Sequence, residues 1–170
     1  KDVLATVTSV SFTGGEPLLV PEVIDLINSL DPKKIRKIEI VTNLTKLNDR
    51  FLSAITKFKK VKISVSLEGT HTHNDYIRFG SEWNTLDNNI NRLLAESNIE
   101  LSASHVLQHT SLFALPGLIK FVEALNIPLH LNEVYHGSYP SSGVLSLRSA
   151  DLTTANHFKS WLNTYQGTYK

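Results

Sequence analysis

The stretch SFTGGEPLL, residues 11–19, follows a β-rich run and precedes a helix signal. Residues 7–13 are therefore predicted to form a strand that ends at this stretch, and the carboxyl ends of strands are where α/β folds bind ligands. Two consecutive glycines, Gly14 and Gly15, allow positive φ and a close approach of the backbone to a ligand, and Glu16 adds a fixed negative charge. Taken alone, the segment is equally compatible with a plain βα turn that places an acidic residue near a helix N-terminus.

Strand-like and helix-like segments alternate along the rest of the chain, at the spacing that βα units of a parallel sheet require. The predicted strands are 7–13, 38–42, 61–67, 101–107 and 127–134. The predicted helices begin at residues 21 and 49 and cover 84–96, 115–125 and 151–165. A long connection follows the third strand, and a loop is expected over 136–149. This order predicts an α/β fold, either a partial (β/α) barrel of parallel strands or an open doubly wound sheet.

The third predicted strand favours the barrel, because its side chains alternate between apolar and polar: Val61, Ile63, Val65 and Leu67 against Lys62, Ser64, Ser66 and Glu68. Central parallel strands are usually apolar on both faces. Polar pairs recur in three other strands: Ser11 and Thr13, Ser102 and Ser104, His130 and Asn132. We expect these polar side chains to share one concave side, with the apolar set packed on outer helices. Edge strands with one solvated face are the alternative.

The composition fits one soluble domain, with 170 residues, 41% hydrophobic and 19% charged. Within it we expect the barrel over 1–135 and a loop and helix packed on it over 136–170. The net charge of +1 gives no reason to propose nucleic acid or an anionic membrane as partner. No apolar run is long enough for a membrane span and no signal peptide is evident, so a cytoplasmic location is expected. The absence of cysteine excludes disulfides and thiolate ligands within these residues.

Four segments, in this order, resemble motifs of radical S-adenosylmethionine (SAM) enzymes. They are the GGEP motif at 14–17, the TNG motif at 42–44, the S-x-D-G motif at 64–69, and the h-d-x-x-R positions at 73–78 with the Trp at 83. The details are most similar to the twitch-type branch, which is related to peptide and sulfatase maturases. Two residues depart from the pattern, because Leu44 stands in a glycine position and Glu68 replaces an aspartate.

The resemblance implies a SAM site. It assigns Gly14, Gly15 and Glu16 to the methionine ammonium, Ser66 and Glu68 to the ribose, and Arg78 to the carboxylate. The complete candidate set is Thr13, Gly14, Gly15, Glu16, Pro17, Thr42, Asn43, Ser64, Ser66, Glu68 and Arg78. These residue types suit the ligand groups, because a guanidinium fork binds a carboxylate and an acidic acceptor binds vicinal hydroxyls. A surface ion pair with Asp75 or Glu82 is the other interpretation of Arg78.

The family's cluster-binding CxxxCxxC segment has no counterpart here. In the family, three cysteines hold a [4Fe–4S] cluster that cleaves SAM reductively, with an external electron donor. We interpret the chain as a radical-SAM-like partial barrel that lacks its first βα unit, through truncation. The full-length protein is then expected to form a 5′-deoxyadenosyl radical, with a peptide or protein as its substrate, and the chain alone is expected to be inactive.

Two other functions remain open. His71, His73 and Asp75 match the HxHxD run of metal-dependent hydrolases, although Tyr76 stands where that family has a further histidine. The missing cysteines also fit a non-catalytic binding or scaffold domain that keeps the barrel without a cluster.

Overall fold

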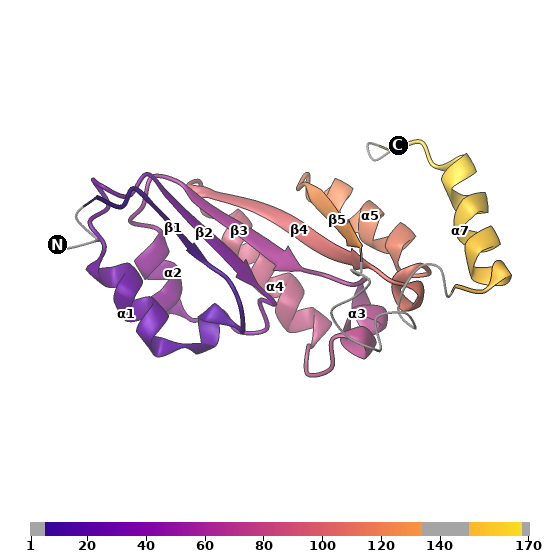
Figure 1. The fold of residues 1–170 in the computed structure, drawn as a ribbon, viewed down its shortest axis with the longest axis horizontal. Helices are drawn as coiled ribbons and strands as arrows, with labels where there is room; N and C mark the ends of the chain where they lie inside the picture. The colour runs from indigo at the N-terminus through magenta and orange to yellow at the C-terminus, as the bar shows by residue number, and fades with distance from the viewer. Residues whose placement is uncertain (1–5, 134–149, 168–170) are drawn as a thin grey trace. The chain divides into compact units, whose positions relative to one another are not determined.

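The structure is a computed structural model and describes residues 6–133 and 150–167. Its strands form one open sheet in the order β1–β2–β3–β4–β5 (Figure 1). Their bounds are β1 Ser9–Phe12, β2 Lys37–Thr42, β3 Val61–Ser66, β4 Ile99–Leu107 and β5 Leu129–Glu133. The pairs β1–β2, β2–β3 and β4–β5 are parallel. The predicted parallel α/β sheet is confirmed, including the order of its first three strands.

The described helices are α1 Pro21–Ser29, α2 Asp49–Ile55, α3 His71–Ile77, α4 Trp83–Leu94, α5 Leu115–Ala124 and α7 Leu152–Thr164, with short 3₁₀ turns η2 Pro17–Leu19 and η3 His109–Ser111. Asn48 caps α2 as predicted, because its side chain accepts a hydrogen bond from the Phe51 amide at 2.7 Å. Helix α3 was not predicted and lies inside the connection expected to be a long loop. None of the helices in the described residues combines the length and apolar character that crossing a membrane requires.

The chain divides into two compact units, the first formed by Lys1–Ser66 and Asn84–Ser102. In this unit α1 and α2 lie side by side (Figure 1). Ile63 and Val65 of β3 are each 1% exposed and belong to the same core as the helix residues Ile27 and Phe51. Their burial confirms that the apolar set of β3 lies in a core shared with helix residues, as the alternation predicted.

The strand register of the first unit tests the expected polar face. Ser11 pairs with Glu39, which pairs with Lys62, so these side chains share one sheet face with Ser64 and Ser66. Ser11 is exposed and the two other serines are half-buried. The predicted common side of Ser11, Ser64 and Ser66 is confirmed.

The second unit consists of Leu67–Trp83 and Ala103–Lys170. Its buried Trp83 ring lies 5.0 Å from the Phe121 ring and 5.2 Å from the His71 ring. Gly69 is required by close packing, since an added Cβ would lie 2.7 Å from the Ala114 Cβ. Residues 134–149 lie outside the described residues, so the loop expected there and the division at 135/136 stay predictions.

Candidate functional site

The glycine pair after β1 adopts the conformation that the sequence suggested. Gly14 has φ +82° and Gly15 has φ +57°, both in the region that favours glycine. A Cβ added at either position would meet no heavy atom within 4 Å. The backbone conformation, and not crowding, therefore requires the glycines, and the space over both peptides is open. Thr13, just before them, is exposed.

Glu16 joins this loop to the end of β2. One carboxylate oxygen accepts hydrogen bonds from Thr42 Oγ1 at 2.6 Å and from the Leu18 amide at 3.2 Å. The other accepts from the Asn43 amide at 2.7 Å. Two predicted motifs, far apart in sequence, are thus linked by one side chain at the carboxyl ends of neighbouring strands. Pro17 follows as the first residue of the buried turn η2.

The end of β2 is fixed from several sides. Thr42 is 2% exposed, and its hydroxyl also accepts from the Leu44 amide at 2.9 Å. The Asn43 side-chain oxygen accepts a hydrogen bond from the Thr45 amide at 3.0 Å, which stabilises this turn. Leu44 adopts φ +54° although it is not glycine, and its carbonyl accepts from Asn89 Nδ2 at 3.0 Å. The residue that departs from the family pattern therefore has a left-handed backbone, a conformation that favours glycine.

The serines of β3 complete the candidate residues of the first unit. Ser64 and Ser66 are half-buried on the polar face of the strand. Neither hydroxyl is hydrogen-bonded to another residue in the part of the chain that the structure describes.

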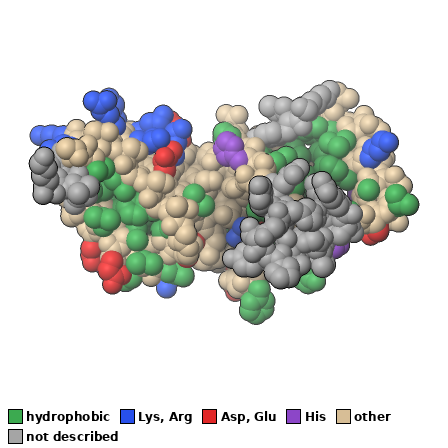
Figure 2. Space-filling model, viewed as in Figure 1, with side chains coloured by type: hydrophobic (Ala, Val, Ile, Leu, Met, Phe, Trp, Pro, Cys, Tyr) green, Lys and Arg blue, Asp and Glu red, His purple; other side chains and the backbone are tan. Residues whose placement is uncertain are grey.

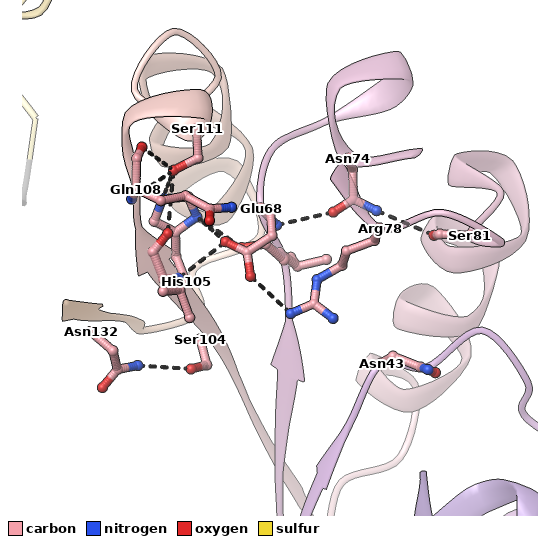
Figure 3. Close-up of polar contacts among 12 residues, drawn as sticks. Asn43, Glu68, Asn74, Arg78, Ser81, Ser104, His105, Gln108, Ser111 and Asn132 are labelled. Atoms are coloured by element: carbon pink, nitrogen blue, oxygen red, sulfur yellow. Dashed lines mark hydrogen bonds and ion pairs between the residues drawn. The ribbon is translucent and has the colours of Figure 1, made fainter. Parts of the chain in front are cut away.

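In the second unit, Glu68 is buried and forms an ion pair with Arg78. Its Oε1 accepts from Arg78 Nη2 at 2.8 Å, and its Oε2 accepts from the Val106 amide at 3.1 Å (Figure 3). Glu68 is only 4% exposed, so it does not line an open lumen as the alternation of β3 suggested. Asp75, one expected partner of Arg78, accepts instead from the Trp83 amide at 3.0 Å.

Arg78 keeps donors that the protein leaves unused. Its Nε is buried and has no hydrogen-bond partner, and the side chain as a whole is 29% exposed. A buried donor without a partner is costly unless a ligand or water satisfies it. The exposed part of the side chain leaves room for a carboxylate ligand, and the predicted role of Arg78 stays a prediction.

His105 and Ser111 extend the network around Glu68. His105 Nδ1 faces the Leu67 carbonyl at 2.9 Å and Glu68 Oε2 at 3.2 Å, so Nδ1 carries a hydrogen and Nε2 accepts from the Ser111 hydroxyl at 3.1 Å. Burial lowers the pKa of His105, assisted by the Arg78 charge, although the nearby Glu68 opposes this shift. The order Ser–His–Glu matches a catalytic relay, but His105 and Ser111 are both 0% exposed. This network is therefore structural.

Asn74 supports the same network from α3. Its Oδ1 accepts from the Glu68 amide at 3.0 Å, and its Nδ2 donates to Ser81 Oγ at 3.2 Å (Figure 3). Sequence reasoning missed Asn74 and His105. The available signal was one titratable residue, His105, among the inward-facing apolar positions of β4.

The HxHxD run lies on α3 and gives no support to a metal site. His71 and His73 are two residues apart on this helix and do not face each other. In residues 6–133 and 150–167, no group of three or more His, Cys, Asp or Glu side chains is placed to hold a metal ion.

The sequence model of the Radical SAM superfamily matches residues 3–109, more than half of the chain. The chain belongs to the radical SAM superfamily. No curated protein matched its sequence. Solved structures with the same fold include Streptococcus suis SuiB bound to S-adenosylmethionine, with a TM-score of 0.64, 17% identity, and coverage of 92% of this chain and 36% of that chain. Native anSMEcpe with bound AdoMet has a TM-score of 0.63, 15% identity, and coverage of 98% and 51%.

The chain spans between a third and about half of the length of these radical SAM structures. Together with the open sheet, this coverage identifies the fold as a partial barrel, as predicted. The 170 residues contain no cysteine and so do not fit the thiolate ligation of an iron–sulfur cluster. Any such ligands must come from residues outside this chain.

Proposed function

We propose that this chain is the SAM-binding core of a radical SAM enzyme. The observation that carries the proposal is the open, left-handed Gly14-Gly15 segment, held to the end of β2 by Glu16. Backbone carbonyls of such a segment can accept from the methionine ammonium, and the Glu16 carboxylate adds attraction. Thr13, Pro17, Thr42 and Asn43 shape this part of the site.

The remaining ligand groups have matching residues. The exposed part of the Arg78 side chain suits the methionine carboxylate. The Ser64 and Ser66 hydroxyls suit the ribose, because neither of them is hydrogen-bonded to a residue that the structure describes. Glu68 was expected at the ribose; its contacts support a role in holding the Arg78 guanidinium in place.

We further propose that the complete protein, with cluster ligands from outside this chain, cleaves SAM reductively to a 5′-deoxyadenosyl radical, with an external electron donor. A peptide or protein is the proposed substrate class. SuiB bound to precursor peptide SuiA shares this fold, with a TM-score of 0.62 and 18% identity, as does anSMEcpe with its Cp18Cys peptide. A twitch-type branch and a cytoplasmic location are part of the same proposal.

Calorimetric titration of SAM into the complete protein tests the site. Glu16→Ala and Arg78→Ala should each weaken binding more than about tenfold, because a charged hydrogen bond contributes about 1.5–3 kcal/mol. Arg36→Ala is the matched control, since Arg36 is an exposed residue just before β2, at the opposite end of this strand from Thr42. Arg78→Lys keeps the charge and removes the fork, so it replaces Arg78→Ala if that variant unfolds. Losses within about twofold for both site variants would disprove the assignment.

The absence of cysteine favours one other function, a non-catalytic binding domain with this fold. Iron and sulfide analysis of the complete protein, prepared without oxygen, separates the two. A radical SAM enzyme contains both elements, and a scaffold contains neither.

A further inference from the structure

A concave site lies at the amino ends of the strands in the first unit. It is a cavity of about 570 Å³ whose lining includes residues 32–33, 35–36, 59–60 and 97–98 and Glu100. These segments lead into β2, β3 and β4, whereas the candidate SAM residues of this unit lie in the carboxyl-terminal halves of their strands or just after them. Because the strands are parallel, the cavity is separate from the glycine loop. Its volume lies in the range of small-ligand pockets.

The lining of this cavity is strongly cationic. Lys33, Arg36, Lys59 and Lys60 contribute positive charge and Glu100 is the one acidic lining residue, which leaves three positive charges in excess. Figure 2 shows Lys and Arg side chains gathered over the part of the first unit where its strands begin. The hydrogen bond from Lys60 lowers the pKa of Glu100, so that carboxylate is ionised at neutral pH.

Three of these cations form no ion pair with any residue that the structure describes. Lys60 bonds to Glu100 at 2.7 Å. In the described part of the chain, the side chains of Lys33, Arg36 and Lys59 form no ion pair and no hydrogen bond, although the Lys33 amide donates to Asp31 Oδ1 at 2.9 Å. Several other cationic side chains of this unit are paired, as Lys37 is with Glu39 at 3.1 Å and Arg92 is with Asp49. Unpaired like charges around one cavity repel each other, and an anion placed among them relieves that repulsion.

The lining also restricts the class of anion. It includes no aromatic side chain on which a nucleobase could stack, and its apolar contribution comes from Pro32 and Ile35. A guanidinium fork with two lysines is the usual way to bind phosphate oxygens. One carboxylate could neutralise only one of the three excess charges, whereas a diphosphate group matches all three near neutral pH. We propose that this cavity binds a small phosphate-bearing anion, with a diphosphate group as its recognised part.

Titration of inorganic pyrophosphate into the complete protein at low ionic strength tests the proposal. We expect saturable binding that Arg36→Gln and Lys33→Gln each weaken about fivefold or more. Lys34→Gln is the matched control, because Lys34 is an exposed cation of the same turn that does not line the cavity. It should change affinity less than about twofold. All three residues are exposed, so thermal unfolding should be unchanged.

Three outcomes would overturn the proposal: no saturation by pyrophosphate at millimolar concentration, equal losses in Lys34→Gln and Arg36→Gln, or tighter binding of citrate than of pyrophosphate. Equal losses would indicate general charge attraction, and a citrate preference would indicate a carboxylate ligand. The proposal does not depend on SAM binding. SAM affinity should be the same in Arg36→Gln as in the unchanged protein, so the two sites are tested separately.

Discussion

The Glu68 carboxylate meets the Arg78 guanidinium at 2.8 Å, with 5% of the Glu68 side chain and 29% of the Arg78 side chain exposed. Removal of the cation leaves a buried carboxylate without its counter-charge, and removal of the anion leaves a partly solvated cation. We therefore expect Arg78→Gln to lower the free energy of unfolding by about 2 kcal/mol and Glu68→Gln by about 1 kcal/mol.

Urea unfolding of both variants measures this difference. The reverse order of the two losses would show that the Glu68 contacts with the Val106 amide matter more than its contact with Arg78. Arg50→Gln is the control, because the Arg50–Asp25 pair is 60% exposed on both sides and its loss should have little effect.

Leu44 provides a test of backbone strain. Its φ of +54° is unfavourable for any residue with a Cβ, and its side chain is 0% exposed. Leu44→Ala and Leu44→Gly should both destabilise the protein by about 2–5 kcal/mol through lost packing. Between them, Gly should be the more stable by about 1 kcal/mol, the opposite of the usual order, because only Ala retains the strain.

Thermal or urea unfolding of the two Leu44 variants decides the point. At Ile27, a helical position that is also 0% exposed, the same pair of substitutions should give the usual order with Ala the more stable. Ala more stable than Gly at position 44 would contradict the left-handed conformation there.

His105 should make stability depend on pH. Burial lowers its pKa in the folded protein below the ordinary 6.5, so the unfolded chain binds a proton more readily than the folded one. The stability that comes from the neutral ring is complete above pH 6.5 and is lost as the pH falls through the folded pKa. We expect His105→Asn, which retains a donor toward the Leu67 carbonyl, to reduce the loss of stability between about pH 7 and pH 5.

Unfolding curves at several pH values measure this slope. His130→Asn, at an exposed histidine in β5, should leave it unchanged. If His105→Asn and the unchanged protein have the same slope, groups other than His105 cause the loss of stability at acid pH.

Much of the fold could be predicted from hydrophobic patterning. The β-rich runs gave the strands in their correct order, and the alternation in β3 predicted which side chains are buried, because side chains alternate between the two faces of a strand. Helix α3 could not be predicted this way. It has seven residues, no side-chain cap at Thr70, a left-handed His71, and one buried residue, the polar Asn74. Apolar periodicity detects helices that bury an apolar face, and this one does not.

The candidate site was predictable in its residues and not in its contacts. The motif at Glu16 indicated a charge at the end of β1, but its bonds to Thr42 and Asn43 depend on the pairing of β1 with β2. Glu68 appeared to belong to a polar strand face. Its burial follows from tertiary contacts with Arg78 and Val106, which local sequence does not encode.

The isolated 170-residue chain should form no 5′-deoxyadenosine from SAM under reducing conditions. It has no cysteine to ligate the iron–sulfur cluster that delivers the electron. Chromatography of the reaction after incubation with dithionite tests this, with the complete protein as the positive control. Product from the chain alone would mean that cleavage proceeds without thiolate ligation.

The hydrogen bond from the Asn43 amide to Glu16 makes this amide a probe of motion in the glycine loop. This amide donates to a side chain 27 positions away, so its hydrogen can exchange with deuterated solvent only when the carboxylate moves off. Neighbouring loop amides without such an acceptor should exchange faster. The exchange rate at this one position therefore measures how often the glycine segment separates from the end of β2, and a ligand seated on the glycines should slow it.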